Sequence, residues 1–425
     1  MFDLRAHATS VHREVLAGCT TYLTMAYIAV VNPLILATAG IDHGAAFVAT
    51  CIAAAIGSAA MGLLANLPLA LAPGMGLNAY FTYTVVKGMG IPWQVALGAV
   101  FASGVLFLIV SLLRVREWLV NAIPMSLKIG IGAGIGLFLG LIGLHEMGLV
   151  TGNPETLVTL GQLGAPATLL SCVGFLIIAG LIARGVPGAI LIGILLTAAL
   201  GVPLRLTEFH GVISEPPSIA PTFLKLDIAG AMSLGVTTVV LTFFLVDVLD
   251  NAGTLIATTQ RAGLMRLDGT IVRLRQALLA DSAGAIIGAL LGTSTTTSYI
   301  ESAAGIQAGG RTGLTAVTVA VLFLATLLFA PLATAIPAFA TAPALVFVAC
   351  LMARALRDID WEDATEYVPA MVIAVGIPFT FSIAAGIGLG FIVYVVVKAA
   401  AKRIGAIAGA VWLVAGLSVL RFVLE

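Results

Sequence analysis

The sequence predicts an all-α polytopic membrane protein of about fourteen transmembrane segments, arranged as a 7+7 inverted repeat. The first observation is composition: the chain is 60% hydrophobic and 9% charged, whereas soluble domains carry about 25% charged residues. The second is that apolar runs near the length needed to cross about 30 Å of hydrocarbon recur along the chain. The third is a weak internal repetition. No hydrophilic block of domain size interrupts the apolar runs, so we expect no separate soluble domain.

The apolar runs give the spans in order. The first run follows Arg5 and Arg13 and is too long for a signal-peptide core, so it is interpreted as a permanent helix. The candidate spans are 16–39, 44–64, 71–86, 93–113, 124–144, 167–183, 186–203, 230–256, 275–291, 293–308, 312–332, 338–356, 368–382 and 385–400, followed by a hydrophobic helix at about 405–423 that spans the membrane or lies in its interface.

The repetition relates the first seven spans to the last seven. Leu-Thr at 23–24 recurs at 241–242, and the pattern Ala-x-x-Gly-x-Leu at 59–64 recurs at 285–290. Because seven is odd, the second half would enter the membrane from the opposite side. Inverted halves of this kind are the arrangement by which many transporters achieve alternating access.

The third and tenth spans look broken, at matching positions in the two halves. In the third, Pro73 removes a backbone donor and Gly74 and Gly76 disfavour helix. In the tenth, the run 293–298 contains only threonine and serine, which are poor helix formers. We predict that each is a short extended piece leading into a half-helix. Such backbone is tolerated at membrane depth only where it is buried or lines a cavity.

Three acids lie in these apolar stretches. Asp247 and Asp250 belong to the eighth span and Glu301 to the tenth. An acid at the centre of a membrane helix costs about 2.5–3.5 kcal/mol on insertion scales, so it usually faces a polar path with a function. Two separate carboxylate sites in one membrane protein indicate a path for a small molecule or an ion.

Charge sets the orientation and excludes several function classes. Outside loops carry only Lys87, Arg205 and Lys225, while most other basic residues fall in inside loops, which predicts a cytoplasmic N-terminus in a cell inner (plasma) membrane. Zero net charge argues against nucleic acid as a partner. The cysteines and histidines show no ligand spacing, so we expect neither a metal site nor a cofactor. The chain also lacks an ATP-binding loop, so ATP is not the direct energy source.

Three strings of the sequence stand out: Ala72-Pro-Gly-Met-Gly-Leu-Asn-Ala-Tyr80, Val246-Asp-Val-Leu-Asp-Asn-Ala-Gly-Thr254 and Gly292-Thr-Ser-Thr-Thr-Thr-Ser-Tyr-Ile-Glu-Ser-Ala-Ala-Gly305. They resemble one family, the nucleobase–cation symporters of the nucleobase–ascorbate transporter type. More narrowly they resemble its AzgA-like branch of adenine, guanine and hypoxanthine permeases. The resemblance implies a core domain at 1–113 and 228–333 and a gate domain at 114–227 and 334–425, with a possible homodimer through the gate domains.

The resemblance implies a secondary active transporter that imports purine nucleobases by proton symport, with the base between spans three and ten and against span eight. Asp250 matches the acid that precedes a short glycine motif in span eight, where uracil and xanthine transporters tend to have glutamate. Glu301 matches the acid of span ten. It begins Glu-Ser-Ala-Ala-Gly305 where those relatives have Glu-Asn-x-Gly, a departure that fits the purine branch.

The chemistry of a base suggests the roles of single residues. A carboxylate accepts from adjacent N–H groups of a base, which suits Asp250 and Glu301. Asn78 offers a donor and an acceptor, and Phe81 or Tyr80 a ring for stacking. Tyr299 and Ser302, beside Glu301, complete the candidate substrate-binding residues.

Proton coupling is assigned to the same acids. Asp247 lies three residues before Asp250, on the same helical face. Two close carboxylates repel, so we expect one of them to hold a proton near neutral pH. Asp247, Asp250 and Glu301 are therefore the candidate proton-coupling residues. Sodium is the less favoured coupling ion.

Other readings stay open. Each acid, Asn78 or Tyr299 has a plain structural alternative as a cap, an interhelical hydrogen bond or a packing residue. At the level of function, an anion transporter or channel of the sulfate or bicarbonate type on the same architecture is the alternative, although acids disfavour an anion site. An intramembrane aspartyl protease needs two aspartates on facing helices, and here both lie on one helix. The sequence does not choose among adenine, guanine, hypoxanthine and xanthine.

Overall fold

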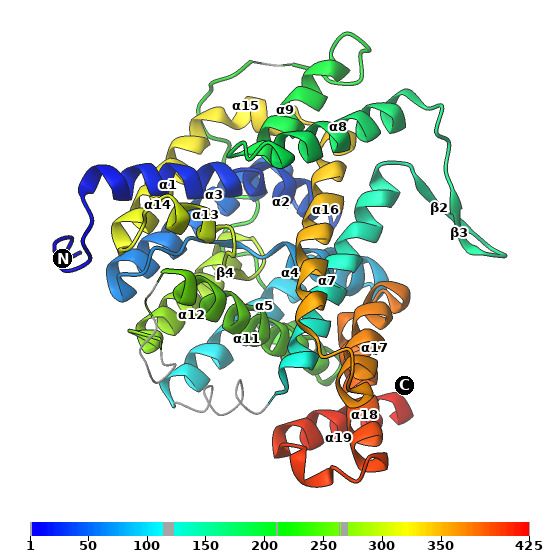
Figure 1. The fold of residues 1–425 in the computed structure, drawn as a ribbon. Helices are drawn as coiled ribbons and strands as arrows, with labels where there is room; N and C mark the ends of the chain where they lie inside the picture. The colour runs from blue at the N-terminus through cyan, green and yellow to red at the C-terminus, as the bar shows by residue number, and fades with distance from the viewer. Residues whose placement is uncertain (1, 114–122, 210, 263, 265–270, 425) are drawn as a thin grey trace.

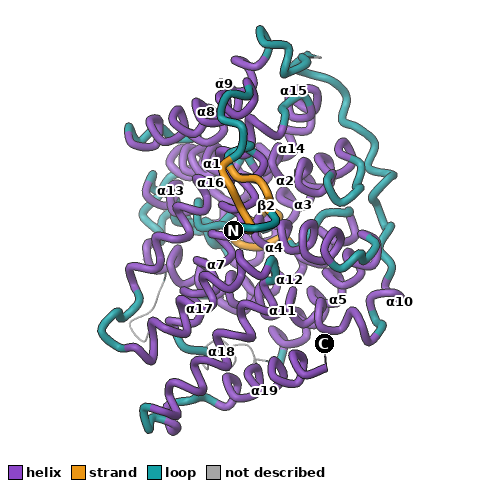
Figure 2. Tube along the Cα trace, turned by 90° about the vertical axis from the view of Figure 1, so that its right-hand side faces the viewer, coloured by secondary structure: helices purple, strands orange, loops and turns teal. Residues whose placement is uncertain are grey.

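The computed structural model describes residues 2–113, 123–209, 211–262, 264 and 271–424. Some side chains in the helix of span eight and in the C-terminal helix are not described, and that of Asp250 is one of them. Among the described residues helix dominates, and the strands that the structure describes lie in two small places (Figure 2). The first half contains α1 Val11–Met25, α2 Ile28–Ala37, α3 His43–Ala60, a π-helical turn Met61–Ala65, β1 Leu71–Pro73, α4 Met75–Ala79, a π-helical segment Tyr80–Gly88, α5 Trp93–Leu112, α7 Met125–Glu146, β2 Val150–Asn153, β3 Leu157–Leu160, α8 Pro166–Ala183 and α9 Ala189–Gly201.

The second half resembles the first in having a span that consists of a short strand followed by a short helix. That span is the tenth of the chain, and the long helix α11 forms the eighth. Its elements are α10 Ile228–Ala231, α11 Leu234–Ala262, α12 Leu274–Leu291, β4 Thr296–Ser298, α13 Ser302–Gln307, α14 Gly313–Thr326, α15 Ala330–Thr334, α16 Ala338–Ala353, α17 Ala364–Thr380, α18 Ile383–Ala400 and α19 Gly409–Leu424, with 3₁₀ turns at Leu327–Phe329, Arg354–Asp358 and Ile404–Ala406.

Each predicted span has a counterpart at the expected place. Within the described residues, nine helices are long and apolar enough to cross a membrane, and shorter apolar helices accompany them. Spans three and ten are broken as predicted: β1 leads into α4, and β4 leads towards α13. The polytopic membrane fold with two interrupted spans is therefore confirmed. Physically, hydropathy marks the spans, and Pro73 and the hydroxyl run mark the interruptions.

The two interruptions meet. β1 and β4 pair antiparallel, with Leu71 opposite Ser298 and Pro73 opposite Thr296. The two segments are more than 200 residues apart in sequence, and Figure 1 shows them near the middle of the molecule. The pairing gives the extended backbone of each span the hydrogen-bond partners that lipid does not supply.

The helices pack in two groups. In one, α7 packs against α16 and α17, and α17 against α18. In the other, α3 packs against α12 and α14, α5 against α12, and α1 against α14. Figure 1 shows α17, α18 and α19 gathered at one end of the molecule.

A β-hairpin was missed at the sequence level. β2 and β3 pair antiparallel after α7, and the hairpin projects from the helical body in Figure 1. Its strands contain only eight residues and β3 is exposed throughout, so hydropathy gives little signal for it.

The charge pattern places most basic residues in inside loops, and Lys398 is included among them. In the structure Lys398 lies in the last turn of α18 and is only 5% exposed. Its Nζ is 2.5 Å from Oε1 of Glu366, and Ser126 Oγ donates to Oε2 of the same carboxylate. The three residues come from α18, α17 and α7. A cation at a helix end is thus held by an ion pair that only the packing of three helices creates.

Candidate functional site

The crossing of β1 and β4 is continued by backbone hydrogen bonds on both sides. Gly74 N donates to Thr295 O at 2.9 Å, and Tyr299 N donates to Ala70 O at 3.0 Å. A short helix follows each strand: α4 begins at Met75, with one residue between it and β1, and α13 begins at Ser302, with three residues between it and β4. The start of a helix carries unpaired N–H groups and a partial positive charge, so the crossing is suited to a polar ligand.

Two of the predicted site residues hold span ten to the backbone of span three. The Tyr299 hydroxyl donates to Pro73 O at 2.5 Å. Ser302 Oγ accepts from Ala70 N at 3.0 Å. In this structure both polar groups therefore brace the backbone of span three.

Asn78 and Phe81 lie in the half-helix of span three and the π-helical segment that continues it. Asn78 is fully buried, and its Nδ2 donates to Oδ1 of Asn32 in α2. Phe81 is also fully buried in the apolar core. Its neighbour Tyr80 makes an edge-to-face contact with Phe243 of α11, with ring centroids 5.0 Å apart. Aromatic side chains therefore join span three to span eight.

The acids come from two elements that contact each other. α11, which carries Asp247 and Asp250, packs against α13 and β4. Asp247 is fully buried. The backbone of Asp250 continues α11 one turn further, while its side chain lies outside the described residues. Glu301 directly precedes α13 and is half-buried, and its Oε1 accepts from the hydroxyl of Tyr27 at 3.2 Å. Spans one, eight and ten thus meet beside span three.

Sequence reasoning missed two buried acids. Asp281 in α12 accepts from Ser298 N at 3.1 Å and from Ser298 Oγ at 3.2 Å, so it holds the end of β4. Glu14 in α1 accepts from Thr312 N at 3.2 Å and from Thr315 Oγ1 at 2.6 Å, next to the start of α14. Asp281 lies within an apolar span, the same signal that singled out Asp247, whereas Glu14 precedes the predicted span 16–39 and gave no such signal. The partners of both acids show a structural role.

Several buried polar atoms near the crossing have no hydrogen-bond partner among the residues that the structure describes. Buried polar groups are nearly always paired, so such a concentration marks a place where a ligand or water completes the hydrogen bonds. The atoms belong to spans three, eight and ten and are Asn78 Oδ1, Thr82 Oγ1, both polar atoms of the Asn251 amide, Ser294 Oγ, and Oγ1 of Thr295, Thr296 and Thr297.

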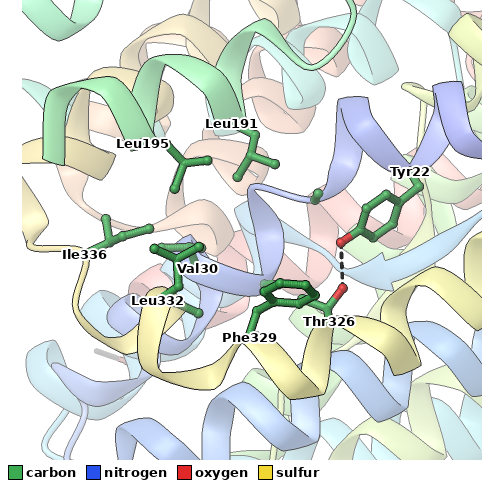
Figure 3. Close-up of a pocket in the computed structure, with 11 residues that line it drawn as sticks. Tyr22, Val30, Leu191, Leu195, Thr326, Phe329, Leu332 and Ile336 are labelled. Carbon is green, nitrogen blue, oxygen red and sulfur yellow. Dashed lines mark hydrogen bonds between the residues drawn. The ribbon is translucent and has the colours of Figure 1, made fainter. Parts of the chain in front are cut away.

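An apolar cavity of about 120 Å³ lies elsewhere, between α1 and α2 on one side and α9 and the α14–α15 segment on the other. Leu191 and Leu195 face Val30 and Leu332 across it (Figure 3). At one end the Tyr22 and Thr326 hydroxyls share a hydrogen bond of 2.6 Å. Its lining is almost entirely hydrocarbon, which does not suit a ligand with several N–H and C=O groups.

Similarity to known proteins agrees with this architecture. Residues 12–389 match the Xan_ur_permease family, described as a permease family. The chain is 47% identical to the adenine permease AdeP of Escherichia coli (strain K12) over 423 residues, which is 100% of this chain and 95% of AdeP. It is 44% identical to the guanine/hypoxanthine permease PbuO of Bacillus subtilis (strain 168), covering 94% of each chain.

The fold also matches solved structures. The transmembrane domain of a cyanobacterium bicarbonate transporter, BicA, superposes with a TM-score of 0.66 at 16% identity, covering 89% of this chain and 97% of that one. Murine Slc26a9, an anion transporter in the inward-facing state, also gives a TM-score of 0.66, at 9% identity. These likenesses confirm the inverted-repeat fold. The chain is a multi-pass membrane permease, not an enzyme, and belongs to the Xan_ur_permease family of the nucleobase–ascorbate transporter type.

Proposed function

We propose that this protein imports purine nucleobases by proton symport, with the base bound at the crossing of spans three and ten. The observation that carries the proposal is the meeting of Asp247, the half-buried Glu301 and a set of unpartnered buried polar atoms where α11 packs on α13 and β4. The permeases AdeP and PbuO, similar over nearly the whole chain, are named for adenine and for guanine and hypoxanthine.

The chemistry of a purine fits these groups. Each edge of the base places N–H donors beside ring-nitrogen or carbonyl acceptors, and a carboxylate accepts from two adjacent N–H groups. We assign that contact to Glu301 and Asp250. The threonine hydroxyls of span ten act as donors or acceptors for the rest of the edge. We assign the rings of Tyr80 and Phe81 to the apolar side of the base-binding site. Tyr299 and Ser302 hold the backbone of span three, which carries Asn78.

Proton coupling follows from the spacing of the acids. Asp247 lies one helical turn before Asp250 on α11, so the two positions share one face of the helix. Their repulsion favours a state in which one proton is bound. Binding of a base that contacts one acid then changes the proton affinity of the other, which is the coupling that symport requires.

We assign the two helix groups to the predicted core and gate domains, and alternating access would then require the contacts between these domains to open. Thr84 Oγ1, in span three, donates to Phe381 O at the end of α17 at 2.8 Å. A Cβ on Gly76 of α4 would lie 2.1 Å from Cγ2 of Ile135 in α7. Because Asn78 and Asp247 are fully buried, a base reaches them only when these contacts separate on one side of the membrane.

The test is uptake of labelled adenine by cells that express the protein, in competition with unlabelled adenine, guanine, hypoxanthine and xanthine. We expect uptake to rise as external pH falls and accumulation to collapse with a protonophore. Uptake that needs sodium and ignores the protonophore would reassign the coupling ion. Transport of labelled bicarbonate or sulfate without transport of any purine would favour the anion-carrier alternative and refute the proposal.

A variant of Asp247 distinguishes proton coupling from substrate binding. We expect Asp247→Asn to retain adenine binding by the purified protein but to lose the dependence of accumulation on pH, because the proton is carried beside the acid that contacts the base. Retention of both binding and pH-dependent accumulation would move the proton to another group, with Glu301 next.

A further inference from the structure

Asn32 of α2 joins four spans through its side-chain amide. Its Nδ2 donates to Thr50 Oγ1 of α3 at 2.7 Å and to Thr293 Oγ1, which directly precedes β4, at 3.0 Å. Its Oδ1 accepts from Nδ2 of Asn78 in α4. All four side chains are fully buried. We name Thr50, Thr293, Asn32 and Asn78 the amide relay.

The direction of the relay is fixed at its far end by a backbone carbonyl. Thr50 Oγ1 donates to Ala46 O at 2.6 Å, and a carbonyl oxygen is only an acceptor. The single hydroxyl hydrogen of Thr50 is thereby used, so towards Asn32 its oxygen acts as an acceptor. The group of Asn32 that meets Thr50 must then be the amide nitrogen.

The same reasoning passes through Asn32 to Asn78. The two hydrogens on Asn32 Nδ2 are taken by Thr50 and Thr293. The atom of Asn32 that is left for Asn78 is the acceptor Oδ1, so Asn78 must point its own nitrogen at Asn32. Amide orientation is usually assigned from such a network, and here the chain of partners leaves one self-consistent choice. Rotating Asn78 would place two carbonyl oxygens against each other.

The orientation leaves one atom of Asn78 for a ligand. Asn78 Oδ1 is buried and has no hydrogen-bond partner among the described residues. We infer that Asn32 is a positioning residue for substrate selection, because it holds Asn78 so that the carbonyl oxygen, and not the NH₂ group, is available to the bound base. This inference rests on the proposed function and adds to it the polarity of the contact from span three.

The consequence is a preference for bases with an N–H at the matching position. Asn78 Oδ1 accepts but cannot donate, and the carboxylate of Glu301 is likewise an acceptor when ionised. A base that offers a ring nitrogen acceptor or a C–H at that position leaves Asn78 Oδ1 buried and unpaired. Such a site discriminates strongly against the analogue that lacks the donor.

The test measures discrimination between matched bases and does not depend on absolute uptake. Labelled adenine uptake into proteoliposomes is competed by unlabelled purines that offer different N–H groups. Hypoxanthine has N1–H and a 6-oxo group where adenine has an unprotonated N1 and a 6-amino group, 7-deazaadenine and 9-deazaadenine carry their ring N–H only at N9 and only at N7, and 1-methylguanine lacks the N1–H of guanine. In the unaltered protein we expect loss of one particular N–H to weaken competition by about tenfold or more. In Asn32→Leu, where Asn78 is free to rotate, we expect that ratio to fall below about threefold.

Thr50→Val tests the amide relay without changing Asn32 or Asn78. Valine keeps the shape and removes the hydroxyl, so the ratio should fall in the same direction. This variant also decides the matter if Asn32→Leu does not fold. The matched control is Thr334→Val, because the Thr334 hydroxyl donates within its own helix, to Ala330 O at 2.9 Å, and this change should leave the ratio as it was.

The outcomes separate the two proposals. Absence of any purine transport by the unaltered protein would refute the proposed function. Purine transport with no donor preference in the unaltered protein would overturn the inference alone. So would variants of Asn32 and Thr50 that weaken competition by all bases equally, because that is the result of a purely structural relay.

Discussion

Backbones approach closely at two places: the crossing of spans three and ten, and the seam where α7 meets α16 and α17. The two places differ in the residue types that allow the approach. At the seam, glycine removes side chains: a Cβ on Gly130 would lie 2.6 Å from Ala370 O, and one on Gly136 would lie 2.5 Å from Met352 Cβ. At the crossing, side chains are kept, and hydroxyls, amides and carboxylates fill the space between the spans.

The difference indicates that the seam contributes mainly to stability and the crossing mainly to transport. Inside a bilayer apolar surface does not drive helices together, so close packing of small residues is the main source of helix association. The glycines of α7 provide that packing and have no polar chemistry. The crossing is held by hydrogen bonds such as Tyr299 to Pro73, and other buried polar atoms there, such as Asn78 Oδ1, have no partner among the described residues. Changes at the crossing should therefore alter transport, and changes at the seam should alter folding.

The largest effect is expected at the crossing. Glu301→Gln and Asp250→Asn each replace a carboxylate by an amide of the same shape, which removes a charged acceptor for the N–H groups of the base. We expect each to lower high-affinity adenine uptake by about tenfold or more, with normal amounts of protein in the membrane. If uptake by both amides stays within about twofold of the unaltered protein, the acids do not bind the base.

The seam should respond in stability. Gly130→Ala forces a methyl group against the backbone of α17, and overpacking of this kind costs about 1–3 kcal/mol. The matched control lies on the same helix: Gly132 has nothing within 4 Å of its Cβ position, so Gly132→Ala should be neutral or stabilising by up to about 1 kcal/mol. Thermal unfolding of both variants in detergent measures the difference. Equal melting temperatures would show that the seam is looser than the structure describes.

The ion pair near the seam should also respond in stability, by a similar amount. Lys398→Met leaves the Glu366 carboxylate without its cation, and we expect a loss of about 1–3 kcal/mol because Glu366 is partly solvated. Lys398→Met combined with Glu366→Met removes both charges and should recover part of the loss. A thermal-unfolding double-mutant cycle measures the pair. If the double variant is as unstable as the sum of the two single variants, Lys398 and Glu366 are not coupled.

The smallest effect concerns Asp363, which precedes α17 on the surface. Hydrogen bonds from the Thr365 hydroxyl and backbone N–H, and then from Arg403, lower the pKa of Asp363 from 3.8 to about 2. Because the unfolded chain binds the proton first, this contribution to stability is present above pH 3.8 and is lost as pH falls towards about 2. Asp363→Asn should therefore lose less stability on acidification. The exposed Asp360→Asn serves as the control, and thermal unfolding across this pH range is the measurement.

The sequence by itself determined the class of fold and the two interrupted spans to which the candidate site is assigned. Hydropathy marked the spans because the requirement for about 20 apolar residues is local to each span. Pro73 and the threonine run marked the interruptions, because loss of a donor and poor helix propensity are also local properties. An acid such as Asp247 stood out because an ionisable group in an apolar run is costly wherever it occurs.

Tertiary structure decided how those pieces meet. The register that sets Pro73 opposite Thr296, the Tyr299 hydroxyl on Pro73 O and the contact from Asn32 to Asn78 each join different spans. The ion pair of Lys398 with Glu366 is of the same kind. Side-chain hydrogen bonds between spans leave no periodic pattern in the sequence. Their partners depend on which helix faces touch, and the order of the helices along the chain does not specify that. That is the reason the direction of the Asn78 amide became visible only in the folded protein.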